Sequence, residues 1–586
     1  MKHKKIKNII GTLMMISTSL ALLTGCMKKL DLSPETQLSD GSFWKNISDL
    51  KQGCNYLYTF LNGIGINKYD DPTGNPSPLQ DNYSDKTFGY SYGSIGIGDG
   101  SRIAKPNSVE WTNFYALIRA ANNVLEKSKN VTGDINEINK YQGEAHFFRA
   151  LGYFELVKRF GDVPYYNHTL TVGEDLYASR TPRQEVVDSI YADLDFAANY
   201  CPQPDAQAAA DYGRITRTAA LGYKSRVALF EGTWDKFRNL PTSQRNLQAA
   251  IDASGRVMSE GRHALYTSQG EKSYFYLFQY DGGPAGNPIQ MGYGPTKNYT
   301  YATNKESMLV RLYGQNTNNI IAFHPFGRAF PGDGNMQPTK AMVEAYLYKD
   351  GLPPGFSPYD SLANQTSSLT EFRNRDPRFE MSVFNNTMDY ITVQGGIRPY
   401  VAGRTYVSRK YFSICDYMNS KQFVNFIILR YAEVLLNNAE AKFELNDQIS
   451  DGDLNQTINL LRNRATNNDI NKLPLLTNSF VQANGLDMRA EIRRERTVEL
   501  AFEGFAYWDI LRWKTAEIVS PKEVLGRKYF VNEDLTASTP PPLSADGYVL
   551  LEAASFRSFK PQRDYLWPLP TRELALNSNL QQNPGW

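Results

Sequence analysis

Apolar residues recur at steps of three and four over much of this chain, the spacing that places side chains on one face of an α-helix. The first such face consists of Phe43, Ile47, Leu50, Cys54, Leu57 and Leu61. The same spacing predicts further helices over residues 111–125, 138–160, 183–200, 216–234, 247–261, 432–443, 454–465 and 488–514.

Helical spacing is weak in two long stretches, 62–110 and 262–424, which are rich in Gly, Pro, Asn and Tyr. These residue types favour turns and loops, so we expect irregular structure there with a few short strands and helices. The chain is therefore predicted to be mainly α. A helical scaffold covers about 42–265 and 425–515, an irregular half of about 266–424 is inserted in the middle, and an extended, Pro-rich segment spans 516–586.

The segment 438–465 has the helix–turn–helix pattern of a tetratricopeptide unit, with small Ala residues where two helices would cross. No strict 34-residue period accompanies it. The prediction of tetratricopeptide-like helix pairs therefore depends on the shape of this segment and not on a sequence repeat.

The first 26 residues have the pattern of an export signal. Met1–Lys7 is cationic, Ile9–Leu23 is mostly apolar, and Leu23-Thr24-Gly25 precedes Cys26. We predict a lipoprotein signal peptide over 1–25 with Cys26 as the acylated first residue of a mature chain 26–586, and ordinary secretion as the alternative. No later apolar stretch reaches 18 residues, so we expect no membrane-spanning helix after the leader.

Composition narrows the possible partners. The chain has 63 Lys and Arg against 61 Asp and Glu, with no basic run after the leader, so nucleic acid is not an expected partner. The remaining cysteines, Cys54, Cys201 and Cys415, are widely spaced and form no CxxC motif, so neither a disulfide framework nor a zinc site is expected.

Sequence motifs typical of catalytic and metal-binding sites are incomplete in this chain. The G-x-S-x-G at 89–93 lacks the flanking strand and helix of a nucleophile elbow. The run from Asp451 lacks the Gly and Glu of a calcium loop. We therefore predict no catalytic residue, metal ligand or cofactor. A glycoside hydrolase stays open as an alternative, because its two carboxylates can come from distant positions.

The notable chemical feature is aromatic, with 37 Tyr, 30 Phe and 7 Trp in the chain. Eight aromatic residues crowd into positions 274–301, with Gly, Asn, Gln and Asp between them. Aromatic faces can stack on a sugar ring while amides and carboxylates bind its hydroxyls, so this segment predicts a binding site for a polar ligand. The alternative is that individual rings pack in the core.

Motifs along nearly the whole mature chain resemble those of the SusD/RagB family of outer-membrane nutrient-binding lipoproteins. They are Leu30–Pro34, Phe43-Trp44, Gly143–Ala150, Phe160–Pro164, Gly213–Arg217, Arg375–Arg378, Arg430–Asn437, Glu499–Gly504, Asp509–Trp513, Tyr565–Pro570 and Gln582–Trp586. The resemblance implies a scaffold of tetratricopeptide-like helix pairs with a ligand-binding half. It also implies a lipid anchor in the outer membrane, facing the cell exterior.

The resemblance implies that the protein captures oligosaccharides and delivers them to a SusC-like TonB-dependent transporter, without being an enzyme. A peptide-binding lipoprotein of the RagB type, a surface glycoside hydrolase and a structural lid for the transporter are the alternatives. By position, the family's ligand site is built from loops around 80–100 and 265–330. Our candidate ligand-binding residues are therefore Tyr83, Tyr90, Tyr92, Tyr274, Tyr276, Tyr293 and Tyr299, with Asn82 and Asp85 as polar partners.

The family motifs themselves mostly mark the scaffold. A stripe of carboxylates at Glu491, Glu495, Glu499 and Glu503 has arginines nearby, and ion pairs between packed helices are its expected role. We expect the same role for Glu433, Glu440 and Arg496.

Overall fold

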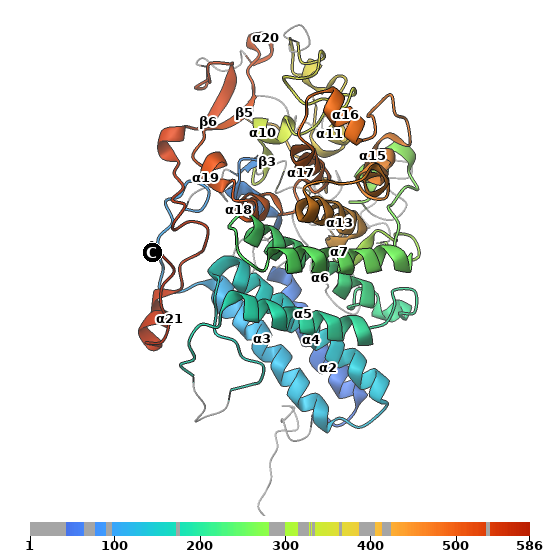
Figure 1. Ribbon diagram of the computed structural model, residues 1–586, viewed down its shortest axis with the longest axis vertical. Coiled ribbons are helices and arrows are strands. Elements are labelled where there is room, and N and C mark those ends of the chain that lie inside the picture. Colours follow the sequence, from blue (N-terminus) through green and yellow to red (C-terminus); the bar gives the residue numbers. More distant parts are fainter. Residues whose placement is uncertain are drawn as a thin grey trace, which may run out of the picture.

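The computed structural model is built mainly of helices, which confirms the predicted fold class (Figure 1). It describes residues 43–63, 77–89, 96–170, 176–279, 299–313, 327, 330, 334–361, 366–385, 405–412, 423–534 and 540–586. The predicted Cys26 anchor and Cys415 lie outside these residues.

The N-terminal half is a stack of long helices, each packed on the next (Figure 1). α3 packs on α4, α4 on α5, α5 on α6 and α6 on α7, while α13 of the second half lies against α6 and α7. The bounds are α2 (Ile47–Leu57), α3 (Val109–Lys127), α4 (Ile135–Phe160), α5 (Arg183–Tyr200), α6 (Arg217–Lys236), α7 (Ser243–Glu260) and α13 (Tyr431–Asn446).

These helices begin where the sequence supplies a cap. Asn46 forms a capping box with Asp49 at the start of α2, and the side chains of Ser108, Asp134 and Thr216 accept backbone N–H groups at α3, α4 and α6. α4 ends at Gly161, whose φ of 73° stops the helix before Pro164. The predicted helices of this half are confirmed, with ends shifted by a few residues.

Gly232 allows α6 and α7 to approach closely. A Cβ added there would lie 2.8 Å from the backbone nitrogen of Leu247 and 2.8 Å from its Cγ. We expect Gly232→Ala to lower the free energy of unfolding by about 1–2 kcal/mol, because overpacking costs about 1–3 kcal/mol and outweighs the gain of roughly 1 kcal/mol in helix propensity. Urea unfolding of the variant measures the change.

Gly255 in α7 is the matched control. A Cβ there would meet no atom within 4 Å, so Gly255→Ala keeps only the propensity gain and should stabilise the protein by about 0.5–1 kcal/mol. Equal effects of the two substitutions would contradict the proposed close contact between α6 and α7.

The second half begins with shorter helices around α13 (Figure 1). The predicted pair at 438–465 is present as α13 and α15, which are in contact, and Ser450 caps α14 where the sequence resembles a calcium loop. These helices are α14 (Asp451–Asn455), α15 (Ile458–Thr466), α16 (Asn478–Ala483), α17 (Met488–Glu499) and α18 (Ala506–Arg512).

The prediction of one continuous helix over 488–514 is wrong. The chain breaks between α17 and α18, where Phe502 and Gly504 adopt φ values of 64° and 88°. The carboxylate of Asp81 accepts the N–H groups of Gly504 (3.1 Å) and Ala506 (2.8 Å), so a distant segment stabilises the start of α18. Glu503 therefore lies beyond the helix that carries Glu491, Glu495 and Glu499.

The strands form three small antiparallel pairs in the described residues. β1 pairs with β3 (Thr87 opposite Pro338), β2 with β4 (Val310 opposite Ile427), and β5 with β6 (Leu525 opposite Leu550). Their bounds are β1 (Thr87–Phe88), β2 (Ser307–Arg311), β3 (Gln337–Pro338), β4 (Phe426–Arg430), β5 (Val524–Lys528) and β6 (Tyr548–Glu552).

Short helices complete the irregular half and the C-terminal segment. The segment 516–586 contains the extended strands β5 and β6, and it also contains three helices of four to six residues that were not predicted. These elements are η2 (Ser77–Tyr83), α8 (Ser273–Tyr276), α10 (Lys340–Val343), α11 (Arg378–Ser382), α19 (Ala516–Val519), α20 (Val531–Asp534) and α21 (Thr571–Leu576).

One large hydrophobic cluster joins the two halves. It runs from Leu50 through Phe147 and Leu429 to Trp567, so the C-terminal segment is part of the core. Cys54 and Cys201 are buried free thiols in it. Among the described residues, no helix is both long and apolar enough to cross a membrane.

Candidate functional site

Residues 80–89 of the first predicted loop contribute polar side chains to a cluster where η2, β1 and β3 meet. Asn82 is buried and donates from Nδ2 to the backbone oxygen of Asn335 (2.8 Å), while its Oδ1 accepts from Thr87 Oγ1 (2.8 Å). Asp85 is half-buried, and its Oδ2 pairs with Lys86 Nζ at 3.1 Å. The pairing of β1 with β3 thus places Asn335 and Gln337 beside the predicted residues.

Asn335 and Gln337 keep hydrogen-bonding capacity inside this cluster. Both are about 1–2 % exposed, yet in the described part of the chain neither amide atom of Asn335, nor Oε1 of Gln337, has a hydrogen-bond partner. An unsatisfied buried polar atom costs about 1–3 kcal/mol, so these amides have unused capacity to donate and to accept hydrogen bonds. We call Asn82, Asp85, Thr87, Asn335 and Gln337 the amide cluster.

Three predicted stacking residues instead lie in the core, which corrects the sequence analysis. Tyr274 is fully buried, donates from its hydroxyl to Glu499 O (2.8 Å) and accepts from Lys410 Nζ (3.0 Å). Burial and the nearby Glu499 carboxylate raise the pKa of Tyr274 well above its usual range. Tyr83 and Tyr299 are each less than 8 % exposed, so their ring faces contact protein.

Of the four remaining candidate tyrosines, one lies among the described residues. Tyr276 is half-buried, with its ring perpendicular to that of Phe275 at 5.4 Å between centroids, and its backbone oxygen accepts from Tyr299 Oη at 2.9 Å. Tyr90, Tyr92 and Tyr293 lie outside the described residues. Tyr276 is therefore the described tyrosine of the predicted set that is not buried.

A buried network of ten charges supports both predicted loops. Five carboxylates face five cations, and none of these side chains is more than 4 % exposed. Since the charges balance, their attraction can offset the cost of desolvation. The members of this central network are Glu306, Asp376, Glu495, Glu499 and Glu503 with Arg378, Lys410, Arg430, Arg462 and Arg464.

Glu499 is the hub of the central network. Its oxygens contact Arg430 Nη1 (2.6 Å), Arg378 Nη1 (3.1 Å) and Arg464 Nη2. These three guanidinium groups outweigh desolvation and hold the pKa of Glu499 well below its usual range. Glu499 on α17 thereby connects β4, α11 and α15, which come from separate parts of the chain.

The central network also fixes the two predicted loops relative to each other. Lys410 Nζ bonds Tyr274 on one side and Glu503 (2.6 Å) on the other, and the neighbouring Gly504 N–H binds Asp81, next to Asn82. Burial lowers the pKa of Lys410 to about 8, despite the attraction of Glu503. The described parts of both loops, through Tyr274 and Asp81, are therefore connected to the same segment, 500–505, between α17 and α18.

A second buried network connects α13 with α17 and α18. Glu440 binds Arg512 through both oxygens (2.5 and 2.7 Å) and Trp513 Nε1 (2.6 Å), while Arg496 pairs with Asp509 (2.9 Å). Glu433 pairs with Arg226 at 2.6 Å. The predicted role of Glu433, Glu440, Arg496, Glu499 and Glu503 as ion pairs between elements is confirmed.

The arrangement suits binding more than bond-breaking chemistry. The carboxylates of Glu495, Glu499 and Glu503 are buried and committed to cations, so they are poor candidates for proton transfer. In the described part of the chain no group of three or more His, Cys, Asp or Glu is placed to hold a metal ion. Outside these ion pairs, the candidate loops contain the buried amides of the cluster, the half-buried carboxylate of Asp85 and the half-buried ring of Tyr276.

Together, the helical stack and the irregular half with its buried polar clusters define a mainly helical protein of two packed parts. The SusD family model matches residues 300–586, and a second model, "Starch-binding associating with outer membrane", matches residues 30–229. The chain belongs to the SusD/RagB family, as the sequence motifs predicted.

Individual relatives match over almost the entire chain. SusD-like protein P2 of Formosa agariphila is 26 % identical over 97 % of this chain and 98 % of its own. A SusD-like carbohydrate-binding protein of Bacteroides fragilis has the same fold, with a TM-score of 0.71 at 23 % identity, covering 92 % of this chain and all of that one. A laminarin-binding SusD-like protein also aligns, with a TM-score of 0.57 at 20 % identity over 92 % of this chain and all of its own.

Sequence reasoning missed Asn335 and Gln337. They lie just beyond the 265–330 segment, and their position beside Asn82 arises from the β1–β3 pairing of residues about 250 apart. Strands of two residues leave no periodicity in a sequence, so no local signal marks this contact.

Proposed function

We propose that this protein is a cell-surface, non-enzymatic lipoprotein that captures oligosaccharides and delivers them to a SusC-like TonB-dependent transporter. In this proposal Cys26 carries the lipid that anchors the chain in the outer membrane, with the ligand site facing the exterior. Family membership, and relatives whose names include carbohydrate binding and laminarin binding, support this function.

The observation that carries the proposal is the amide cluster. Asn335 and Gln337 offer donors and acceptors that the described residues leave unused, next to Asn82 and Asp85 in the loop predicted to bind ligand. Sugar hydroxyls both donate and accept, so they match this set. Net hydrogen bonds of about 0.5–1.5 kcal/mol each give weak to moderate affinity, which suits a receptor that must release its ligand.

Calorimetric titration with a panel of neutral and acidic oligosaccharides tests the proposal. We expect saturable binding of at least one glycan, and we expect Tyr276→Ala to weaken it about 3–10-fold, since aromatic stacking contributes about 0.5–1.5 kcal/mol. Tyr56→Ala is the control, because Tyr56 is 59 % exposed on α2, which packs on α3 and α4 in the helical stack. If both variants bind the glycan with equal affinity, Tyr276 is not part of the ligand site.

Two further readouts separate the alternatives. New reducing ends during incubation with the bound glycan would contradict the non-enzymatic role and indicate a surface hydrolase. Saturable binding of peptides with no response to any glycan would replace glycan capture by peptide capture.

A further inference from the structure

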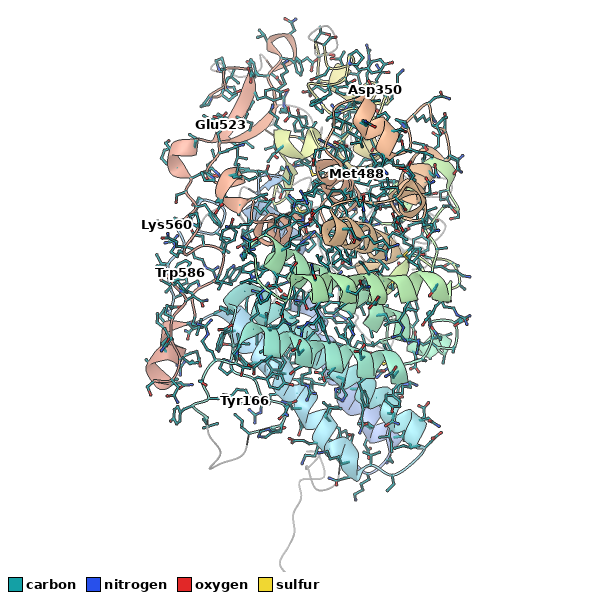
Figure 2. The ribbon with its side chains drawn as sticks, in the orientation of Figure 1. Tyr166, Asp350, Met488, Glu523, Lys560 and Trp586 are labelled. Carbon is teal, nitrogen blue, oxygen red and sulfur yellow. The ribbon has the colours of Figure 1, made fainter. Side chains whose placement is uncertain are left out.

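A second pocket lies far from the amide cluster in the chain, between the ends of α6 and α18 and the C-terminal segment. It has a volume of about 390 Å³, within the range of about 300–1,000 Å³ typical of small-molecule sites. Figure 2 places Lys560 and Trp586, which flank the C-terminal part of its lining in the sequence, at one edge of the molecule. Its principal side chains are Trp234, Arg238, Lys514, Glu517, Arg563 and Tyr565.

Arg238 is the central cation of this pocket. Its guanidinium carbon lies 3.4 Å from the ring centroid of Trp234 and 4.6 Å from that of Tyr565, so two aromatic rings fix its position. It donates to the backbone oxygens of Trp234 (3.2 Å) and Leu511 (3.0 Å), which uses two of its five N–H donors. Among the described residues, it forms no ion pair with a carboxylate.

The charge of Arg238 is only partly compensated. The two carbonyls it binds lie in the last turns of α6 and α18, whose dipoles offset a fraction of a unit charge. Burial and the nearby Arg183 lower the pKa of Arg238 to about 10, which still leaves the group charged at neutral pH. The guanidinium therefore keeps both charge and donors for an anion.

The other charged residues leave the pocket positive. Lys514 is exposed directly after α18 and has no ion-pair partner in the described part of the chain. Arg563 is committed to Asp564 (2.6 Å) and to the backbone oxygen of Gly100 (2.8 Å). Glu517 is the one carboxylate in the lining, so two uncommitted cations face a single negative charge.

We infer that this pocket binds the anionic group of an acidic sugar, a carboxylate or a sulfate ester, within a captured glycan. The inference rests on the proposed function, because it assumes a saccharide ligand. Arg238 would supply charge-assisted hydrogen bonds, Lys514 a second positive charge at the rim, and the aromatic rings a rigid apolar wall. The pocket would thus select for charged chains over neutral ones.

Calorimetry with three matched probes tests the inference: galactotriose, trigalacturonic acid and galactotriose carrying a sulfate ester. We expect at least one acidic probe to bind about fivefold more tightly than galactotriose. The probe with the higher affinity shows whether the pocket prefers a carboxylate or a sulfate ester. Raising NaCl from 50 to 500 mM should remove most of this preference, because salt screens exposed charges.

Lys514→Gln is the main variant, since Lys514 makes no contact that folding requires in the described structure. We expect it to reduce the preference for the acidic probe several-fold and to leave galactotriose affinity unchanged. Arg238→Gln should abolish the preference, and its melting temperature checks that the fold survives. Arg245→Gln, on the exposed surface of α7 and paired with Asp188, is the charge-matched control.

The outcomes separate the two proposals. If neutral and acidic probes bind equally, or if Lys514→Gln and Arg245→Gln behave alike, the anionic pocket is refuted while glycan capture stands. If no probe and no other glycan binds the wild-type protein, glycan capture fails, and the pocket inference fails with it.

Discussion

Replacing Glu499 by glutamine should lower the free energy of unfolding by about 3–5 kcal/mol, the usual cost of removing one partner from a buried ion pair. The substitution keeps the size of the side chain but leaves the central network with five cations and four carboxylates. Arg464 and Arg430 would then share Glu306, while Arg430 keeps Glu503. Urea unfolding followed by circular dichroism at pH 7 measures the loss.

Glu491→Gln is the matched control, two turns earlier on the same helix. Glu491 contacts Arg494 at 3.3 Å, and burial raises its pKa, so a neutral side chain is tolerated there. We expect a loss of about 1 kcal/mol or less, because Glu491 has one long contact and its burial already favours a neutral side chain. Losses of the same size for both variants would show that the central network contributes no more than the single Glu491–Arg494 contact.

Acid should weaken the second network, because it protonates the carboxylate of Glu440. Arg512, Arg496 and the Trp513 N–H outweigh desolvation and lower the pKa of Glu440 from 4.5 to about 2. Because its folded pKa is depressed, Glu440 stabilises the protein fully above pH 4.5, and this contribution disappears as the pH falls toward 2. The shift corresponds to about 3 kcal/mol at 1.36 kcal/mol per pH unit.

Glu440→Gln therefore should destabilise the protein by about 3 kcal/mol at pH 7, and its difference from wild type should shrink between pH 4.5 and pH 2. Urea unfolding at pH 7, 5 and 3 measures this convergence. Asp447→Asn serves as the control, because the Asp447 side chain is 68 % exposed and solvent screens its pairs with Lys236 and Arg489. A difference for Glu440→Gln that is independent of pH would contradict the proposed ion pair.

Periodicity was sufficient to predict the long helices. α4 and α6 each follow apolar spacing and end near Gly161 and Trp234, so local rules fix them. The periodic pattern wrongly placed Glu503 in a helix. The chain leaves the helix there, and Asp81, more than 400 residues earlier, binds the N–H groups of Gly504 and Ala506. A helix break that depends on a distant carboxylate has no local signature.

The candidate site was less predictable for the same reason. Aromatic crowding led us to predict a site in the 274–301 segment, but composition cannot distinguish the buried Tyr274, which bonds Lys410 and Glu499, from the half-buried Tyr276 two residues later. The two Asn335 amide atoms gain significance only through the β1–β3 pairing. Long-range contacts, more than residue type, decide which side chains can meet a ligand.

The central claim is that the protein binds a glycan and releases it unaltered. Equilibrium dialysis of the purified chain against a panel of oligosaccharides, followed by mass analysis of the recovered ligand, measures both parts at once. The account predicts that at least one glycan is retained saturably and recovered with its original mass. Retention of none, or recovery as shorter fragments, would contradict it.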